Sequence, residues 1–83
     1  MMLEHKIYNR RTRTYMGGPY RESTQFVLDL LRRVLDAKTV NVIEIRTYHT
    51  MRGEPELVAC RKTKWTEDNK VIIACDEEER HGI

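Results

Sequence analysis

The chain has 83 residues, of which 40% are hydrophobic and 34% are charged, and its 15 Lys and Arg against 13 Asp and Glu give a formal net charge of +2 at pH 7. This length excludes a two-domain enzyme or a repeat array, so we expect one small domain over residues 1–83. A domain of this size buries only about 60% of the surface that its unfolded chain exposes, which favours a homodimer or another partner that adds buried area.

The N-terminal segment 1–16 predicts a basic strand or arm. Residues 1–21 carry five Lys or Arg and one Glu, whereas the remaining residues carry ten basic and twelve acidic side chains. In 6–15 neither alternate set of residues is apolar throughout, which is typical of an exposed edge strand. Gly17, Gly18 and Pro19 follow and predict a break in the chain, because two permissive residues meet one that fixes its own φ.

The segment 21–36 predicts an amphipathic helix. Ser23 and Thr24 are candidate N-caps, and Pro19 is an alternative first helical residue. Its polar side carries Asp29, Arg32, Arg33 and Asp36. Apolar residues recur with helical spacing at Phe26, Val27, Leu30, Leu31, Val34 and Leu35.

Three strands are predicted after the helix, at 40–50, 57–65 and 71–75, because β-branched and aromatic residues dominate and the period changes to two. Short polar connections at 51–56 and 66–70 predict antiparallel neighbours in a three-stranded C-terminal meander. The expected fold is therefore α+β in the order β-α-β-β-β, with one helix packed on a small, mainly antiparallel sheet. The acidic segment 76–83 is expected to be a solvated tail.

The last hairpin also has a predicted register, in which Trp65 faces Val71, Thr63 faces Ile73 and Arg61 faces Cys75. The side of the sheet with Trp65, Val71 and Ile73 is the more apolar and should receive the helix. Lys62 and Lys64 then point to the other side, together with Val58, Ile72 and Ala74. This register also places Cys60 and Cys75 on opposite faces, which argues against a disulfide between them.

Residues with catalytic or metal-binding chemistry are sparse. The three histidines, His5, His49 and His81, have no zinc-type spacing to each other or to a cysteine. Ser23 is the only serine, and the glycines lack the spacing of a nucleotide-binding loop. We therefore expect no catalytic residue, no metal, no cofactor and no enzymatic activity.

Arginines alternate with tyrosines in 8–15, and 20–21 repeats the pair. Arginine neutralises phosphates, while tyrosine stacks on bases at about 1–3 kcal/mol per base. Arg and Tyr are also enriched at protein interfaces, so an acidic protein surface is the alternative partner. The candidate binding residues are Tyr8, Arg10, Arg11, Arg13, Tyr15, Arg21, Lys62 and Lys64.

Three functions follow from these residues. The leading hypothesis is a small, non-enzymatic, cytoplasmic nucleic-acid-binding protein, since the start of the chain lacks a signal peptide and its longest apolar run, 71–75, is too short to span a membrane. The alternative is an inhibitor or adaptor, such as a virus or mobile element encodes, that binds a larger host protein. The third is a metal-independent ribonuclease that would use Tyr48, His49, Arg61 and Lys62.

Overall fold

The structure, a computed structural model, describes residues 2–50 and 54–76. The predicted acidic tail therefore lies outside the described residues from position 77 onward. In chain order the elements are β1 (Met2–Asn9), β2 (Thr14–Tyr20), α1 (Thr24–Val34), α2 (Ala37–Val40), β3 (Ile43–Thr50), β4 (Glu56–Trp65) and β5 (Val71–Asp76). The chain thus forms a small α+β domain, as predicted, but with two strands before the helices in place of one, and with two helices where the sequence predicted one.

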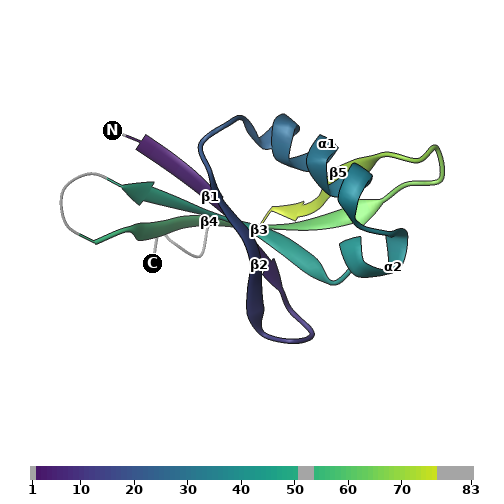
Figure 1. Cartoon of the computed structure of the whole chain (residues 1–83), viewed down its shortest axis with the longest axis horizontal. Coiled ribbons are helices and arrows are strands. Elements are labelled where there is room, and N and C mark those ends of the chain that lie inside the picture. Colours follow the sequence, from purple (N-terminus) through teal and green to yellow (C-terminus); the bar gives the residue numbers. More distant parts are fainter. Residues whose placement is uncertain (1, 51–53, 77–83) are drawn as a thin grey trace.

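The five strands form one antiparallel sheet in the order β2-β1-β3-β4-β5 (Figure 1). The first strand of the chain therefore lies inside the sheet, between β2 and β3, and it is not an edge strand as the sequence predicted. The pairing of β1 with β3 brings Ile7 opposite Ile45 across 38 positions of sequence. Only β2 and β5 are edges of the described sheet.

The expected N-terminal arm is a hairpin, and Asn9 forms its turn. The Asn9 side-chain oxygen accepts hydrogen bonds from the backbone N–H groups of Arg11 at 2.8 Å and Thr12 at 3.0 Å. The Arg13 N–H donates to the Asn9 carbonyl at 2.8 Å, and Arg13 has a φ of 61°. The prediction of one strand over 6–15 was wrong because this Asx turn reverses the chain at its centre.

The glycine and proline residues predicted to break the chain lie inside β2. Gly18 has a φ of 104°, and a Cβ there would lie 2.7 Å from the His5 carbonyl oxygen, so the close approach of β1 and β2 requires glycine. The Gly18-Pro19 peptide bond is cis. Register shifts between His5 and Ile7 and between Ile7 and Tyr8 accommodate this irregular stretch, which an edge strand tolerates.

Helix α1 begins after Ser23, whose Oγ accepts a hydrogen bond from the Phe26 N–H at 3.1 Å. It ends at Val34, and Asp36, predicted to lie on its polar side, instead caps α2 by accepting from the Thr39 N–H at 2.8 Å. Its buried residues are Val27, Leu28 and Leu31. The predicted apolar face of the helix was therefore partly wrong, because Phe26 and Val34 are 39% and 61% exposed.

Both helices lie on one face of the sheet, which we call the helical face (Figure 1). The core forms there between the helices and the strands, and Trp65 and Ile73 pack against it, as the sequence predicted. Its buried members are Ile7, Val27, Leu28, Leu31, Val40, Ile43, Ile45 and Val71. Because side chains alternate along a strand, residues next to the core positions, such as Lys6, Glu44 and Lys64, lie on the opposite face of the sheet. We call this the helix-free face.

The last hairpin starts in the predicted register, with Trp65 opposite Val71 and Thr63 opposite Ile73. A register shift follows, so that Lys62 faces Cys75 and Arg61 faces Asp76. The predicted pairing of Arg61 with Cys75 was therefore wrong, and the argument from it about the two cysteines no longer applies. A sequence with uniform alternation gives no signal for such a bulge.

A second register shift separates β3 and β4, where Thr47 pairs with Ala59 and Tyr48 with Leu57. Val58 is the extra residue, and it lines a cavity on the helical side together with Ala59. The prediction that Val58 faces the lysine side was therefore wrong. Ile72, which pairs with Lys64, is 42% exposed, as expected for that side.

Candidate nucleic-acid interface

Five side chains from three strands meet on the helix-free face, and we call them the tyrosine-cation cluster. Strand β1 supplies Lys6 and Tyr8, β2 supplies Tyr15, and β3 supplies Arg46 and Tyr48. Tyr8 pairs directly with Tyr15, and Lys6 pairs directly with Arg46. The cluster therefore exists only because β1 lies between β2 and β3.

The guanidinium of Arg46 is the centre of the cluster. Its Cζ lies 3.6 Å from the centroid of the Tyr8 ring, and its Nη1 donates to the Tyr15 hydroxyl at 3.0 Å. Its Nε donates to Glu44 at 2.7 Å, in an ion pair whose carboxylate side chain is only 5% exposed. A guanidinium stacked on one side and hydrogen-bonded on its edge has a fixed position, so Arg46 orients the tyrosines around it.

The three tyrosine rings also contact one another. The Tyr8 and Tyr15 rings meet edge to face, with centroids 5.0 Å apart and planes at 64°. The hydroxyl oxygens of Tyr15 and Tyr48 are 2.5 Å apart. The ammonium of Lys6 lies 5.5 Å from the Tyr15 ring centroid and 5.2 Å from that of Tyr48. Aromatic faces and positive charge are therefore held side by side.

The pKa values of the two hydrogen-bonded tyrosines move apart. Burial alone would raise the pKa of Tyr15, but hydrogen bonds from Tyr48 and Arg46 and the charges of Arg46 and Lys6 outweigh it, so the pKa lies below its ordinary value of 10.0. Burial, followed by the hydrogen bond and charge of Tyr15, raises the pKa of Tyr48 to about 12. Of the two hydroxyls, that of Tyr15 therefore loses its proton more readily than that of Tyr48.

Two hollows flank the cluster on the helix-free side. One, of about 380 Å³, is lined by Lys6, Tyr15 and residues 16–19 of β2. The other, of about 290 Å³, is lined by basic residues of the β1–β2 turn and β4, namely Arg10, Lys62 and Lys64, together with Asn41, Thr63 and Ala74. The cross-strand neighbours Tyr15, Tyr8, Glu44 and Lys62 connect the two hollows in one row.

The eight predicted binding residues fall into three groups. Tyr8 and Tyr15 belong to the cluster, and Arg10, Lys62 and Lys64 line the second hollow. Arg10 is anchored there, because its Nη2 donates to the Asn41 carbonyl at 2.8 Å and its N–H donates to the Val42 carbonyl.

Arg11, Arg13 and Arg21 lie apart from these two groups. Arg11 and Arg13 are exposed in the β1–β2 turn, away from the cluster. Arg21 forms an ion pair with Glu4 at 3.0 Å, and Arg21 also lines the cavity on the helical side. The structure therefore brings together five of the eight predicted residues on one face of the sheet.

Sequence reasoning did not assign Lys6, Arg46 and Tyr48 to one site. Along β1, Glu4, Lys6 and Tyr8 lie on one side of the strand, so Lys6 shares a side with the predicted binding residue Tyr8. Along β3, Glu44, Arg46 and Tyr48 lie on one side, so Arg46 and Tyr48 share a side with the acidic Glu44. That alternation was readable. The missing information was the pairing of β1 with β3, which no local pattern encodes.

The four residues considered for a ribonuclease are divided between the two faces. Tyr48 and Lys62 lie on the helix-free side, whereas Arg61 pairs with Ile45 on the helical face, and His49 alternates with Tyr48. No three His, Cys, Asp or Glu side chains within 2–50 and 54–74 lie together so as to hold a metal ion.

No protein-family model, no curated protein and no solved structure matches this chain. No helix in the described ranges is long and apolar enough to cross a membrane.

Proposed function

We propose that this protein binds single-stranded nucleic acid on the helix-free face of its sheet. The observation that carries the proposal is the tyrosine-cation cluster, in which three aromatic rings and two cations are fixed together on a sheet surface that neither α1 nor α2 contacts. Base stacking on aromatic rings combined with phosphate neutralisation is the usual basis of single-strand binding. The base faces of a duplex are not accessible to such rings.

The residues divide between base contacts and phosphate contacts. Tyr15 is 47% exposed and borders the 380 Å³ hollow, so it offers a ring for stacking, while Lys6 stands beside it to neutralise a phosphate. The second hollow adds Lys62 and Lys64 along the same row of the sheet. The Arg46 guanidinium already contacts Glu44 and the tyrosines, so we assign it the role of positioning these side chains.

The experiment is a fluorescence anisotropy titration with labelled single-stranded RNA, single-stranded DNA and duplex of the same sequence. Tyr15→Ala should weaken single-strand binding by about 1–3 kcal/mol, or about five- to 150-fold. Lys62→Gln with Lys64→Gln should weaken binding and reduce its salt dependence by up to about two phosphate contacts. The charge-matched control is Arg33→Gln with Lys38→Gln, on the exposed helices, which should leave binding unchanged. Equal losses in both double variants would overturn the site.

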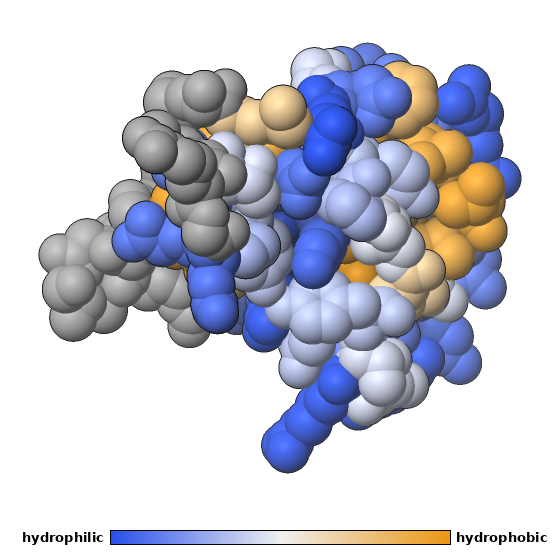
Figure 2. Space-filling model, turned by 60° about the vertical axis from the view of Figure 1, so that its left-hand side comes forward, coloured by the Kyte–Doolittle hydropathy of each residue, from blue (hydrophilic) through white to orange (hydrophobic). Residues whose placement is uncertain are grey.

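A protein-binding role, as an inhibitor or adaptor, is the second candidate. It is favoured by an apolar hollow of about 140 Å³ between α1 and β2, bordered by Met16 and Val34, which are 43% and 61% exposed. Figure 2 shows hydrophobic colour gathered along one side of an otherwise mostly hydrophilic surface. A pull-down with the variant Val34→Glu tests whether a protein binds through this hollow. Such binding would leave the tyrosine-cation cluster unaffected. A cytoplasmic location stays a prediction from the sequence.

A further inference from the structure

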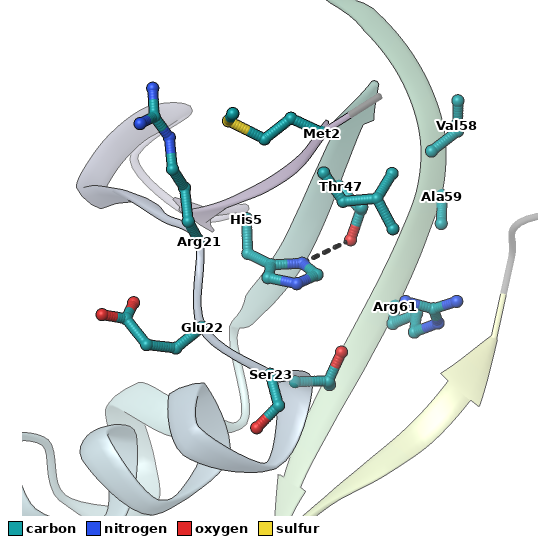
Figure 3. A pocket seen from close by; sticks show the side chains of 11 residues that line it. Met2, His5, Arg21, Glu22, Ser23, Thr47, Val58, Ala59 and Arg61 are labelled. Carbon is teal, nitrogen blue, oxygen red and sulfur yellow. Dashed lines mark hydrogen bonds between the residues drawn. The ribbon is translucent and has the colours of Figure 1, made fainter. Parts of the chain in front are cut away.

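Helix α1 borders three hollows that differ in polarity. At its start it faces a cavity of about 790 Å³, whose lining includes the polar side chains of His5 and Glu22 (Figure 3). Toward β5 it borders a groove of about 460 Å³, to which the helix contributes charged side chains. Toward β2 lies the hollow of about 140 Å³. The α1 residues that line this third hollow are all aliphatic, namely Leu30, Leu31, Val34 and Leu35. An apolar contact therefore fits the β2 side of the helix.

The same side of α1 carries three apolar residues in line, which we call the outer row: Phe26, Leu30 and Val34. They are spaced by four positions, so they follow one another along the surface of the helix. Phe26 and Val34 are exposed, and Leu30 is partly buried. Met16 of β2, also exposed, lines the hollow beside them. The core uses a different side of the helix, through Val27, Leu28 and Leu31. The outer row is therefore left for another contact.

Two charged residues, Asp29 and Arg33, accompany the outer row on its solvent side. Asp29 lies three positions after Phe26, and Arg33 lies three positions after Leu30, so each adjoins the row. Both are exposed, and neither forms an ion pair within the described residues. The Gln25 amide donates to Asp29 at 3.0 Å, which leaves the charge of the carboxylate in place. Together with the outer row, these charges repeat the i, i+3, i+4, i+7, i+8 spacing of a helix-packing face.

The order of the two charges matches a second copy of the helix that runs in the opposite direction. A two-fold axis that relates antiparallel helices keeps both charged rows on the same side of the contact. When the axis passes near Leu30, Arg33 of each copy faces Asp29 of the other. Phe26 of each copy then lies level with Val34 of the other, beside the apolar hollow. A parallel copy would instead place the two charged rows on opposite sides of the contact.

We propose that the protein forms a symmetric dimer through the outer row, with the two α1 helices packed antiparallel. Phe26 of each copy covers the hollow between α1 and β2 of the other, and two pairs of Asp29 with Arg33 set the direction of the helices. The helix-free face lies on the other side of the sheet and stays exposed. Each copy therefore keeps its own tyrosine-cation cluster, and the dimer does not depend on the proposed function.

The first test locates the contact by sedimentation velocity over a range of concentrations of the full chain. Val34→Glu should raise the dissociation constant of the dimer about tenfold or more, because the contact would then bury a carboxylate from each copy. The matched control is Ile72→Glu, at an exposed apolar residue of the edge strand β5, which should leave the constant unchanged. A loss in Ile72→Glu as large as in Val34→Glu would overturn the site. A parent mass of 9.9 kDa throughout would overturn the dimer and leave the outer row to a different protein.

The second test uses the charges, which are exposed and can be changed without disturbing the core. Asp29→Lys and Arg33→Glu each place like charges opposite one another at two symmetric positions, so each variant alone should dimerise about tenfold more weakly than the parent. An equimolar mixture of the two variants should form a heterodimer about as tight as the parent dimer, because one copy then presents two positive charges and the other two negative ones. A mixture that associates no more tightly than either variant alone would overturn the antiparallel contact.

Discussion

At the residue scale, the hydroxyl of Tyr15 connects two groups that determine the electrostatics of the helix-free face. It accepts from Arg46 at 3.0 Å and lies 2.5 Å from the Tyr48 hydroxyl. The first proton lost from the pair should come from Tyr15, because its pKa is lowered, and the last from Tyr48, whose pKa is about 12.

Tyr15→Phe tests this arrangement without removing the ring. Two of the three effects that raise the pKa of Tyr48, the hydrogen bond and the charge of Tyr15, are lost in this variant, so the pKa should fall from about 12 toward 10.0. Ultraviolet absorbance of the phenolate groups in a pH titration measures the change. Base stacking uses the ring and should survive, so the variant should bind single strands nearly as the parent does. A titration curve still rising at pH 12 would contradict the assignment.

At the element scale, the turn between β1 and β2 depends on one side chain. Asn9→Ala removes the acceptor of two backbone hydrogen bonds, from Arg11 and Thr12, and should lower the free energy of unfolding by about 1–2 kcal/mol. Asn9→Asp keeps an acceptor oxygen and serves as the control. The midpoint of urea unfolding measures both. A loss in Asn9→Asp as large as in Asn9→Ala would mean that the turn does not depend on this acceptor.

Helix α1 offers a matched pair for the core. Leu31 is 0% exposed, so Leu31→Ala should cost about 2–5 kcal/mol, whereas Val34, at 61% exposed, should cost about 0.5 kcal/mol or less on the same change. In a domain of this size each kcal/mol shifts the melting temperature by about 4–8 °C. Calorimetry on both variants checks the face assigned to the helix, and similar melting temperatures for the two would refute it.

At the scale of the whole molecule, we expect a homodimer in solution. A core built between two short helices and one face of a five-stranded sheet is small, and β2 and β5 leave two strand edges among the described residues. Exposed apolar side chains at Met16, Val34 and Ile72 lie near these edges or on α1. Light scattering at micromolar concentration should give twice the chain mass of 9.9 kDa, and a mass of 9.9 kDa would contradict the dimer.

The sequence by itself determined the features that depend on neighbours along the chain. The α+β class, helix α1, strands β3 to β5, the first pairs of the last hairpin and the apolar side that receives the helix were all predicted, because period and turn composition are local properties. The N-terminal hairpin was missed because its turn lies among strand-forming and charged residues, where the Asn9 side chain replaces the usual glycine signal.

Only the tertiary structure decided which residues share a site. Lys6 and Arg46 are 40 positions apart and become direct neighbours through the pairing of β1 with β3, and His5 meets Thr47 in the same way. Register also depends on bulges, each of which moves the following side chains to the opposite face. Contacts between distant strands depend on the order in which the whole sheet assembles, and a single chain's local pattern carries no record of that order.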